Sequence, residues 1–182
     1  MRVFICVLLI VGFAAARTPR EVLPRILHED EFSVVGIEVR TSNAKEMAGN
    51  GVIGKQWQRF FQEGVLQKIP NKASGNIYAI YSDYVSDRNG EYSFTLGAKV
   101  LPGTTPPAGF VLKKVPTGSY AVVTTETGPS GKVVSQAWQR VWVMEDRHEL
   151  GGARAYRTDF ELYDQRASDP QNAQVDLYIG LK

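Results

Sequence analysis

The sequence predicts an α+β fold, in which two tandem strand-helix-strand-strand modules related by pseudo-twofold symmetry form a mostly antiparallel sheet with the helices on one side. The first observation behind this prediction is a weak internal repeat, and the second is the shared order of strand-like and helix-like segments in both halves. Because duplicated modules usually meet along a groove, we also expect a ligand cleft between them. The repeated stretches are Trp57-Gln58-Arg59 with Trp138-Gln139-Arg140, Ser82-Asp83-Tyr84 with Thr158-Asp159-Phe160, and Gly97-Ala98-Lys99 with Gly180-Leu181-Lys182.

The first module covers residues 31–101 in this prediction. Val35, Ile37 and Val39 alternate with other residues, as the buried face of a strand does. Apolar residues at helical spacing follow a polar loop, and a glycine is expected to end that helix. Asn89-Gly90 favours a hairpin turn, because both residues tolerate positive φ. The predicted elements are a strand over 31–40, a loop over 42–51, a helix from Ile53 to Gly64, and strands over 76–85 and 92–101.

A linker over 102–109, rich in proline and glycine, leads to the second module, which covers 110–182. Ser130 is expected to cap a helix that carries an apolar stripe. Trp57 and Trp138 lie on the stripes of the two predicted helices, and we interpret both as core residues. The predicted elements of this module are strands over 110–115 and 119–125, a helix from Ser130, and strands over 153–163 and 174–182.

Residues 1–16 have the pattern of a secretory signal peptide. Arg2 precedes an apolar run that ends in Ala14-Ala15-Ala16, which supplies the small residues of a signal-peptidase site. We expect cleavage after Ala16 and export to the periplasm or the medium, with an uncleaved anchor as the alternative. The run is shorter than the ~20 residues that span a bilayer, so no stable membrane span should remain after cleavage. Residues 17–30, interrupted by prolines, are interpreted as an N-terminal arm.

Composition excludes several classes of function. The 182 residues carry a formal charge of +2 without a clustered basic face, so we expect no nucleic-acid partner. Cys6 is the only cysteine and lies in the predicted signal peptide, which leaves the mature chain without a disulfide or a thiolate. His28 and His148 have no ligand spacing to each other, so we expect no metal site. Phosphate-binding glycine motifs are absent, and we expect no cofactor.

Glu161 is the side chain with the clearest chemical potential. It lies in the middle of a predicted strand, where alternation puts Asp159, Glu161 and Tyr163 on one face and Phe160 and Leu162 on the other. Phe160 and Leu162 suit the core, so the acidic face meets either solvent or a polar-lined cleft. The internal repeat aligns Glu161 with Val85, which indicates that the module does not require an acid there for folding.

A carboxylate on the floor of an aromatic cleft would be suited to an organic cation. Removing it from water costs several kcal/mol unless a charge pairs with it. Aromatic rings around a bound cation would each contribute roughly 0.5–2 kcal/mol through cation–π contact. For each ring, an ordinary place in the core is the alternative to ligand contact. The available rings are Tyr78, Tyr81, Tyr84, Tyr120, Trp142, Tyr156 and Tyr163.

Five stretches of the sequence, taken together, resemble the effector-binding domains of the GyrI-like and AraC-type superfamily, and most closely the integron-cassette effector-binding branch. The resemblance covers about 31–182, and it implies two tandem modules around a cleft of the multidrug-binding kind. It also implies that Glu161 faces this cleft and meets cationic, lipophilic compounds. Tyr163, Trp142 and Tyr156 are further candidate ligand contacts, chosen for their proximity in sequence to Glu161 and the aromatic character of such clefts. The five stretches are Val34-Val35-Gly36-Ile37-Glu38-Val39-Arg40, Trp57-Gln58-Arg59-Phe60, Tyr81-Ser82-Asp83-Tyr84, Gly118-Ser119-Tyr120-Ala121-Val122 and Ala155-Tyr156-Arg157-Thr158-Asp159-Phe160-Glu161-Leu162-Tyr163.

Three functions are compatible with these observations. Because we find an export signal and no helix-turn-helix segment, the leading hypothesis is an exported, stand-alone binding protein that sequesters or carries lipophilic, cationic small molecules. The second is a hydrolase of strained or electrophilic compounds, in which Glu161 is the general base and Tyr163 orients the substrate. The third is a protein-interaction or inhibitor module. The sequence does not distinguish a binding acid from a catalytic one.

Overall fold

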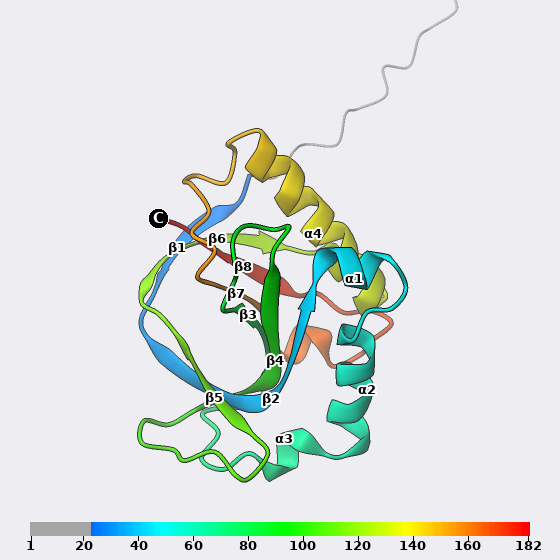
Figure 1. Ribbon diagram of the computed structural model, residues 1–182, viewed down its shortest axis with the longest axis vertical. Coiled ribbons are helices and arrows are strands. Elements are labelled where there is room, and N and C mark those ends of the chain that lie inside the picture. The colour runs from blue at the N-terminus through cyan, green and yellow to red at the C-terminus, as the bar shows by residue number, and fades with distance from the viewer. Residues whose placement is uncertain (1–22) are drawn as a thin grey trace, which may run out of the picture.

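The computed structural model describes residues 23–182; the predicted signal peptide, its cleavage point after Ala16 and residues 17–22 of the predicted arm lie outside this range. Within it, eight strands form one sheet in which every pairing is antiparallel, accompanied by four α-helices (Figure 1). The predicted α+β class and antiparallel sheet are therefore confirmed. The strands are β1 (Arg25–Glu29), β2 (Phe32–Ser42), β3 (Ile77–Ser82), β4 (Glu91–Val100), β5 (Val111–Val115), β6 (Gly118–Thr124), β7 (Thr158–Tyr163) and β8 (Asp176–Gly180). The helices are α1 (Asn43–Met47), α2 (Ile53–Gln62), α3 (Val65–Lys68) and α4 (Ser130–Asp146), with a short 3₁₀ helix, η1 (Gln165–Ala167).

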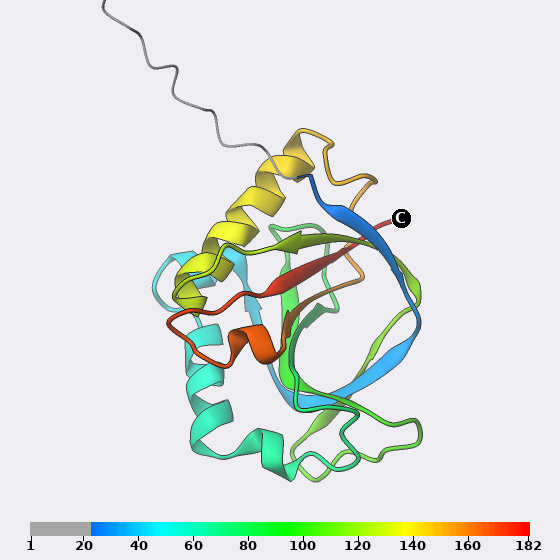
Figure 2. The same cartoon turned by 180° about the vertical axis from the view of Figure 1, so that it is seen from behind.

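The sheet curls because its two edges are tied together by the chain. The strand order is β1-β6-β8-β7-β3-β4-β2-β5, so β1 and β5 are the edge strands. Asp30-Glu31 connects β1 to β2, which lies near the opposite edge, and Pro116-Thr117 connects β5 to β6 in the same way. These short connections draw the edges toward each other and give the rolled sheet seen from both sides in Figures 1 and 2.

A pair of glycines permits close packing of β2 against β4. Gly36 and Gly97 lie opposite each other in these strands. A Cβ atom on Gly36 would lie 2.0 Å from the carbonyl oxygen of Leu96, and one on Gly97 would lie 2.1 Å from that of Val35. Glycine inside a strand commonly marks such a close backbone approach. Any larger residue at either position would push the two strands apart.

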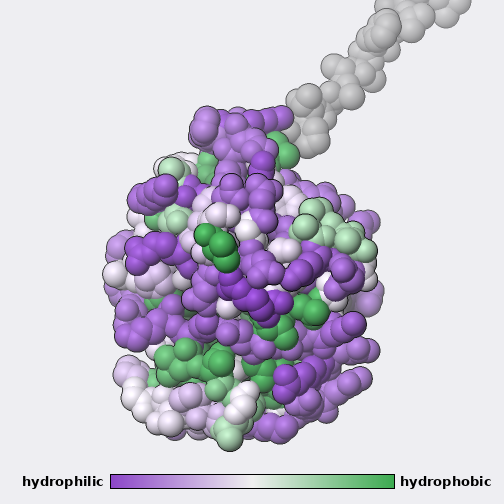
Figure 3. Space-filling view, viewed as in Figure 1, coloured by the Kyte–Doolittle hydropathy of each residue, from purple (hydrophilic) through white to green (hydrophobic). Residues whose placement is uncertain are grey.

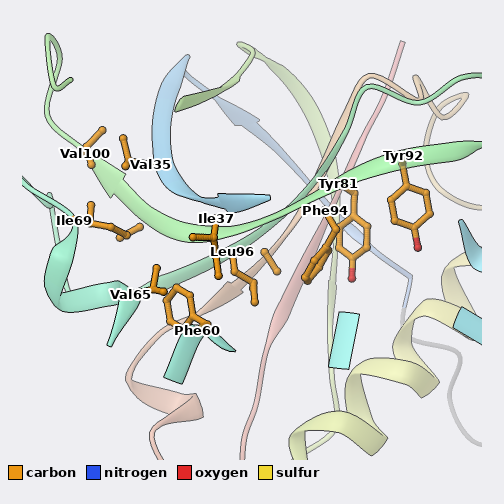
Figure 4. Packing of buried hydrophobic residues seen from close by; sticks show 12 residues of the cluster. Val35, Ile37, Phe60, Val65, Ile69, Tyr81, Tyr92, Phe94, Leu96 and Val100 are labelled. Atoms are coloured by element: carbon orange, nitrogen blue, oxygen red, sulfur yellow. The ribbon is translucent and has the colours of Figure 1, made fainter. Parts of the chain in front are cut away.

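The two faces of the sheet bury different cores. Inside the curl, aromatic and aliphatic side chains such as Ile80 and Phe160 form one cluster. On the outer face, α2 and α3 cover a second cluster, part of which Figure 4 shows around Phe60, and α4 covers a third. Trp138 and Tyr163 pack against both outer clusters, so they mark the seam between the two helix-covered regions.

Most predicted elements are present, and the differences concern short elements and element ends. Gly64 ends α2 in the left-handed region, with φ of 59°, as predicted. Four short elements were not predicted: β1 lies within the expected arm, α1 lies within the expected loop over 42–51, and α3 and η1 lie where no element was expected. Ser130 is the first residue of α4, and the N-cap position expected for it is occupied by Pro129. The strand expected over 153–163 begins only at Thr158, because the chain before it is irregular.

The molecular surface is mainly hydrophilic on the face shown in Figure 3, where hydrophobic residues form small separate patches. Within residues 23–182, no helix combines the length and the hydropathy needed to cross a bilayer. Several large apolar side chains are exposed, among them Met47 at 72% and Phe61 at 64%. Both belong to the wall of the cavity described next.

Candidate functional site

A cavity of about 1130 Å³ lies on the helix-covered side of the sheet. Its walls come from both halves of the chain, with α1 and α2 from the first half and α4 from the second, and strands β3, β4 and β7 contribute side chains between them. Its size matches the upper range of pockets that enclose drug-sized molecules. Eight of the lining residues are aromatic: Trp57, Phe61, Tyr81, Tyr84, Tyr92, Trp138, Trp142 and Tyr163.

Glu161 lies in this lining, on β7, and is only 2% exposed. Its Oε1 atom accepts hydrogen bonds from the hydroxyl of Tyr81 at 2.7 Å and from the indole Nε1 of Trp138 at 2.6 Å. Its Oε2 atom accepts one from the hydroxyl of Tyr163 at 2.6 Å. The three donors come from β3, α4 and β7, so the carboxylate is fixed where sheet and helix meet at the cavity.

The electrostatic setting of Glu161 is unusual for a buried acid. Burial raises the pKa of its carboxyl group, and the hydrogen bonds from Trp138, Tyr163 and Tyr81 oppose that shift only in part. None of the ion pairs within residues 23–182 includes Glu161. Burial, together with the nearby carboxylate, also raises the pKa values of Tyr81 and Tyr163 well above normal, so both remain neutral donors. When Glu161 is ionised, its charge is therefore stabilised by hydrogen-bond dipoles alone.

A second buried network flanks the site and is internally balanced. The guanidinium of Arg154 lines the cavity and pairs with Asp159 at 2.7 Å and with Glu145 at 3.3 Å. Asp159 is fully buried and also accepts hydrogen bonds from the hydroxyl of Tyr84 at 2.6 Å and from the backbone amide of Gly180 at 2.8 Å. Although burial opposes the charge on Arg154, Asp159 raises the pKa of this guanidinium above its usual value. This pair holds the C-terminal strand and the cavity wall together.

Three of the four predicted ligand contacts line the cavity: Glu161, Tyr163 and Trp142. Tyr156 does not; it belongs to the irregular segment before β7 and has φ of 52°. Its ring lies 4.4 Å from the guanidinium carbon of Arg154, and its hydroxyl donates to Glu145. We therefore do not propose direct ligand contact for Tyr156.

Two residues interpreted as core from the sequence belong to the cavity wall. Trp57 and Trp138 are half-buried and line the cavity, and Trp138 contacts Glu161 directly. Tyr81 also contacts Glu161, although the sequence offered it only as one of seven available rings. The repeat of Trp57-Gln58-Arg59 as Trp138-Gln139-Arg140 was the one signal that set the two tryptophans apart from other stripe residues. Among residues 23–182, no group of histidine, cysteine, aspartate or glutamate side chains is arranged to hold a metal ion.

Comparison with known structures agrees with this architecture. The integron cassette protein VCH_CASS2 of Vibrio cholerae has 27% sequence identity to this chain and a TM-score of 0.68, over 88% of this chain and 96% of its own. SAV2435, whose structure was determined bound to tetraphenylphosphonium, has a TM-score of 0.72 over 88% of this chain and 94% of its own. At 17% identity, SAV2435 shares the fold with this chain.

Sequence comparison identifies the family. YobU of Bacillus subtilis (strain 168), which is named as a transcriptional regulator, is 32% identical over 163 residues, covering 86% of this chain and 96% of YobU. The family model described as "Integron-associated effector binding protein" matches residues 25–181, almost the whole of the described chain. The resemblance drawn from the sequence is thereby confirmed, and the chain belongs to the family of integron-associated effector binding proteins.

Proposed function

We propose that this protein binds lipophilic organic cations in the cavity and acts as a stand-alone protein that sequesters or carries them. The observation that carries this proposal is the Glu161 carboxylate, which is buried, held by three neutral donors and left without an ion pair among residues 23–182. A buried charge without a partner costs several kcal/mol. A bound cation would remove that cost, whereas a neutral or anionic guest would not.

The aromatic lining supports a lipophilic rather than a strongly hydrated cation. Trp138 and Tyr163 touch the carboxylate, and Tyr81 packs against Trp138 with ring centroids 4.9 Å apart. A cation at Glu161 would therefore lie beside several ring faces or edges, each worth roughly 0.5–2 kcal/mol when desolvated. The tetraphenylphosphonium bound to SAV2435, a protein of the same fold, belongs to this chemical class.

The predicted pseudo-twofold relation of the modules also belongs to this proposal. In the middle of the sheet, β3 of the first half pairs with β7 of the second, and Ala79 lies opposite Glu161. The repeated tryptophans, Trp57 and Trp138, both line the cavity from helices of different halves. A cleft between duplicated modules would explain this arrangement, with Glu161 having no acidic counterpart at the repeat position, Val85.

A displacement titration with tetraphenylphosphonium tests the charge partner. Glu161→Gln keeps the shape and the acceptor oxygen, and we expect it to weaken binding by more than about tenfold, or about 1.4 kcal/mol. Asp164→Asn is the matched control, because this carboxylate lines the same cavity but already pairs with Arg166 at 2.8 Å. Tetraphenylborate, which has the same shape and the opposite charge, should not compete. Equal affinity of wild type and Glu161→Gln would remove the proposal, and hydrolysis of an electrophilic test substrate that Glu161→Gln abolishes would point to an enzyme.

We further propose that the protein acts after export. This part rests on the signal-like residues 1–16 alone. N-terminal sequencing of protein recovered from outside the cytoplasm should give Arg17 as the first residue. Protein that begins at Met1 and is recovered from the soluble cell interior would contradict export, without affecting the binding proposal.

A further inference from the structure

The charged side chains in the cavity wall leave a second acid without an ion pair. The wall contains Glu46, Arg154, Glu161 and Asp164. Arg154 is paired with Asp159, and Asp164 is paired with Arg166. No ion pair within residues 23–182 includes Glu46 or Glu161. Within residues 23–182, the cavity therefore has two carboxylates without an ion pair, one from each half of the chain.

The fold fixes the position of the Glu46 carboxylate. Its Oε1 atom accepts hydrogen bonds from the hydroxyl of Thr41 at 2.5 Å and from the backbone amide of Val52 at 2.9 Å. Its Oε2 atom accepts only one longer bond, from the backbone amide of Ile53 at 3.3 Å. Gly51 is required beside it, since a Cβ atom there would lie 2.1 Å from Oε2. Oε2 thus keeps capacity for a further partner.

Two tyrosine rings separate the carboxylates. Tyr81 donates to Glu161, and its ring lies 5.5 Å from that of Tyr92, centroid to centroid. Figure 4 shows these rings side by side with their hydroxyls pointing the same way. The hydroxyl of Tyr92 donates to Asn43, which lies on α1 with Glu46. Burial raises the pKa of Tyr92, and the charges of both Glu46 and Glu161 raise it further.

Apolar surface accompanies the second carboxylate as well as the first. Met47 follows Glu46 in α1, lines the cavity and is 72% exposed. Ile53, whose amide bonds to Glu46, also lines it. The Glu46 end therefore combines a fixed negative charge with hydrophobic surface near the mouth, and the Glu161 end combines a buried charge with aromatic rings.

From this arrangement we infer that the preferred ligands are dications, elongated lipophilic molecules with a cationic group at each end, one beside Glu161 and one beside Glu46. The inference rests on the proposed function, because the first cationic group occupies the site proposed for Glu161. The apolar spacer of such a ligand would lie along Tyr81 and Tyr92. Because a carboxylate would meet a cationic group at each end of the ligand, dications would bind more tightly than monocations of equal length.

The test compares methonium dications of increasing chain length with alkyltrimethylammonium monocations of the same chain length, by calorimetric titration. We expect at least one dication to bind about tenfold or more tightly than its monocationic counterpart. Glu46→Gln should remove that advantage while the monocation stays within about twofold of wild type, which also shows that the variant is folded. Glu161→Gln should weaken both probes.

The outcomes separate the two proposals. If monocations bind in a Glu161-dependent manner but no dication in the series gains affinity, or if Glu46→Gln weakens both probes equally, the dication inference is wrong and the proposed function stands. If neither probe depends on Glu161, the proposed function itself fails. Glu46→Gln retains one acceptor oxygen, which can keep the shorter of the two backbone bonds, that from the amide of Val52, so the variant removes the charge while keeping the main contact between α1 and α2.

Discussion

The indole of Trp138 donates a hydrogen bond of 2.6 Å to the carboxylate of Glu161, and this contact joins helix α4 to strand β7 at the cavity. The same oxygen accepts the hydroxyl of Tyr81 from β3. Hydrogen bonds to a carboxylate stabilise its charged form and so lower its pKa. Trp138 is the largest contribution that opposes the effect of burial on Glu161. The hydrogen bond from Trp138 therefore influences both the position and the ionisation of Glu161, the residue proposed to pair with the cation.

Replacing Trp138 with phenylalanine should weaken cation binding at neutral pH. The variant keeps an aromatic ring but loses the donor, so the pKa of Glu161 should rise further and a smaller fraction of the carboxyl should be ionised. We expect a several-fold loss of tetraphenylphosphonium affinity that recovers as the pH is raised. Trp57→Phe is the control. Trp57 also lines the cavity, but the donors to Glu161 within residues 23–182 are Tyr81, Trp138 and Tyr163. A loss of the same size at every pH would contradict the proton-linked explanation.

Cation binding should increase with pH and release protons. Because the pKa of Glu161 is raised, its carboxyl stays protonated to higher pH than that of an exposed glutamate, and a permanent cation should bind only the ionised form. Affinity for tetraphenylphosphonium should therefore rise as the pH passes upward through the pKa of Glu161 and then level off. Calorimetry in two buffers of different ionisation enthalpy measures the released protons. A wild-type profile as flat as that of Glu161→Gln would refute the linkage.

Glu161→Gln should stabilise the ligand-free protein at neutral pH. The folded-state pKa of Glu161 is raised above the unfolded value, so its stabilising contribution is present below about pH 4.3 and is lost as the pH rises through the folded-state pKa. A neutral glutamine avoids this loss, and each pKa unit of difference is worth about 1.4 kcal/mol. Urea unfolding at neutral pH should give a higher free energy of unfolding for the variant, and the gain should shrink toward acid. A variant less stable than wild type at neutral pH would mean that the carboxylate is not strained by burial.

The long elements of the fold follow from periodicity, and the short ones do not. In β2, Val35 and Ile37 alternate as expected of a strand, and both are buried against the helices. By contrast, α1 contains no buried residue, so it leaves no apolar period to detect. In β1, no residue is fully buried, and this strand is specified by its pairing with β6 rather than by its own pattern. Local sequence cannot specify an element whose stability comes from a distant partner.

Of the site, the sequence could predict only which side chains of one strand share a face. Because side chains alternate along β7, Glu161 was expected on the face of the strand away from Phe160. Phe160 is indeed in the core inside the curl. The roles of Tyr81 and Trp138 depend on β3 lying next to β7 and on α4 packing over that pair. An apolar stripe on a helix has the same spacing whether its tryptophan fills a core or borders a cavity. Distinguishing the two requires the three-dimensional arrangement.

Separating the buried pair of Arg154 and Asp159 should be among the most costly single changes in the molecule. Their side chains are 3% and 0% exposed, so Asp159→Asn leaves a buried guanidinium with Glu145 as its remaining carboxylate. Breaking a buried pair costs about 3–5 kcal/mol, and we expect about 3 kcal/mol here because Glu145 remains. Arg154→Met combined with Asp159→Asn should cost less than the sum of the two single changes.

The control for this cycle is the exposed pair of Arg59 and Glu63, whose side chains are 48% and 46% exposed at 2.9 Å. Glu63→Gln should change the free energy of unfolding by less than about 0.5 kcal/mol, because water screens exposed pairs. Urea unfolding of the two single variants and the double variant at neutral pH measures the coupling. Additive costs for Arg154→Met and Asp159→Asn would show that the two charges do not depend on each other. In that case the loss in Asp159→Asn would come from the hydrogen bond that Asp159 accepts from the amide of Gly180, which the guanidinium does not share, whereas the hydroxyl of Tyr84 contacts both side chains.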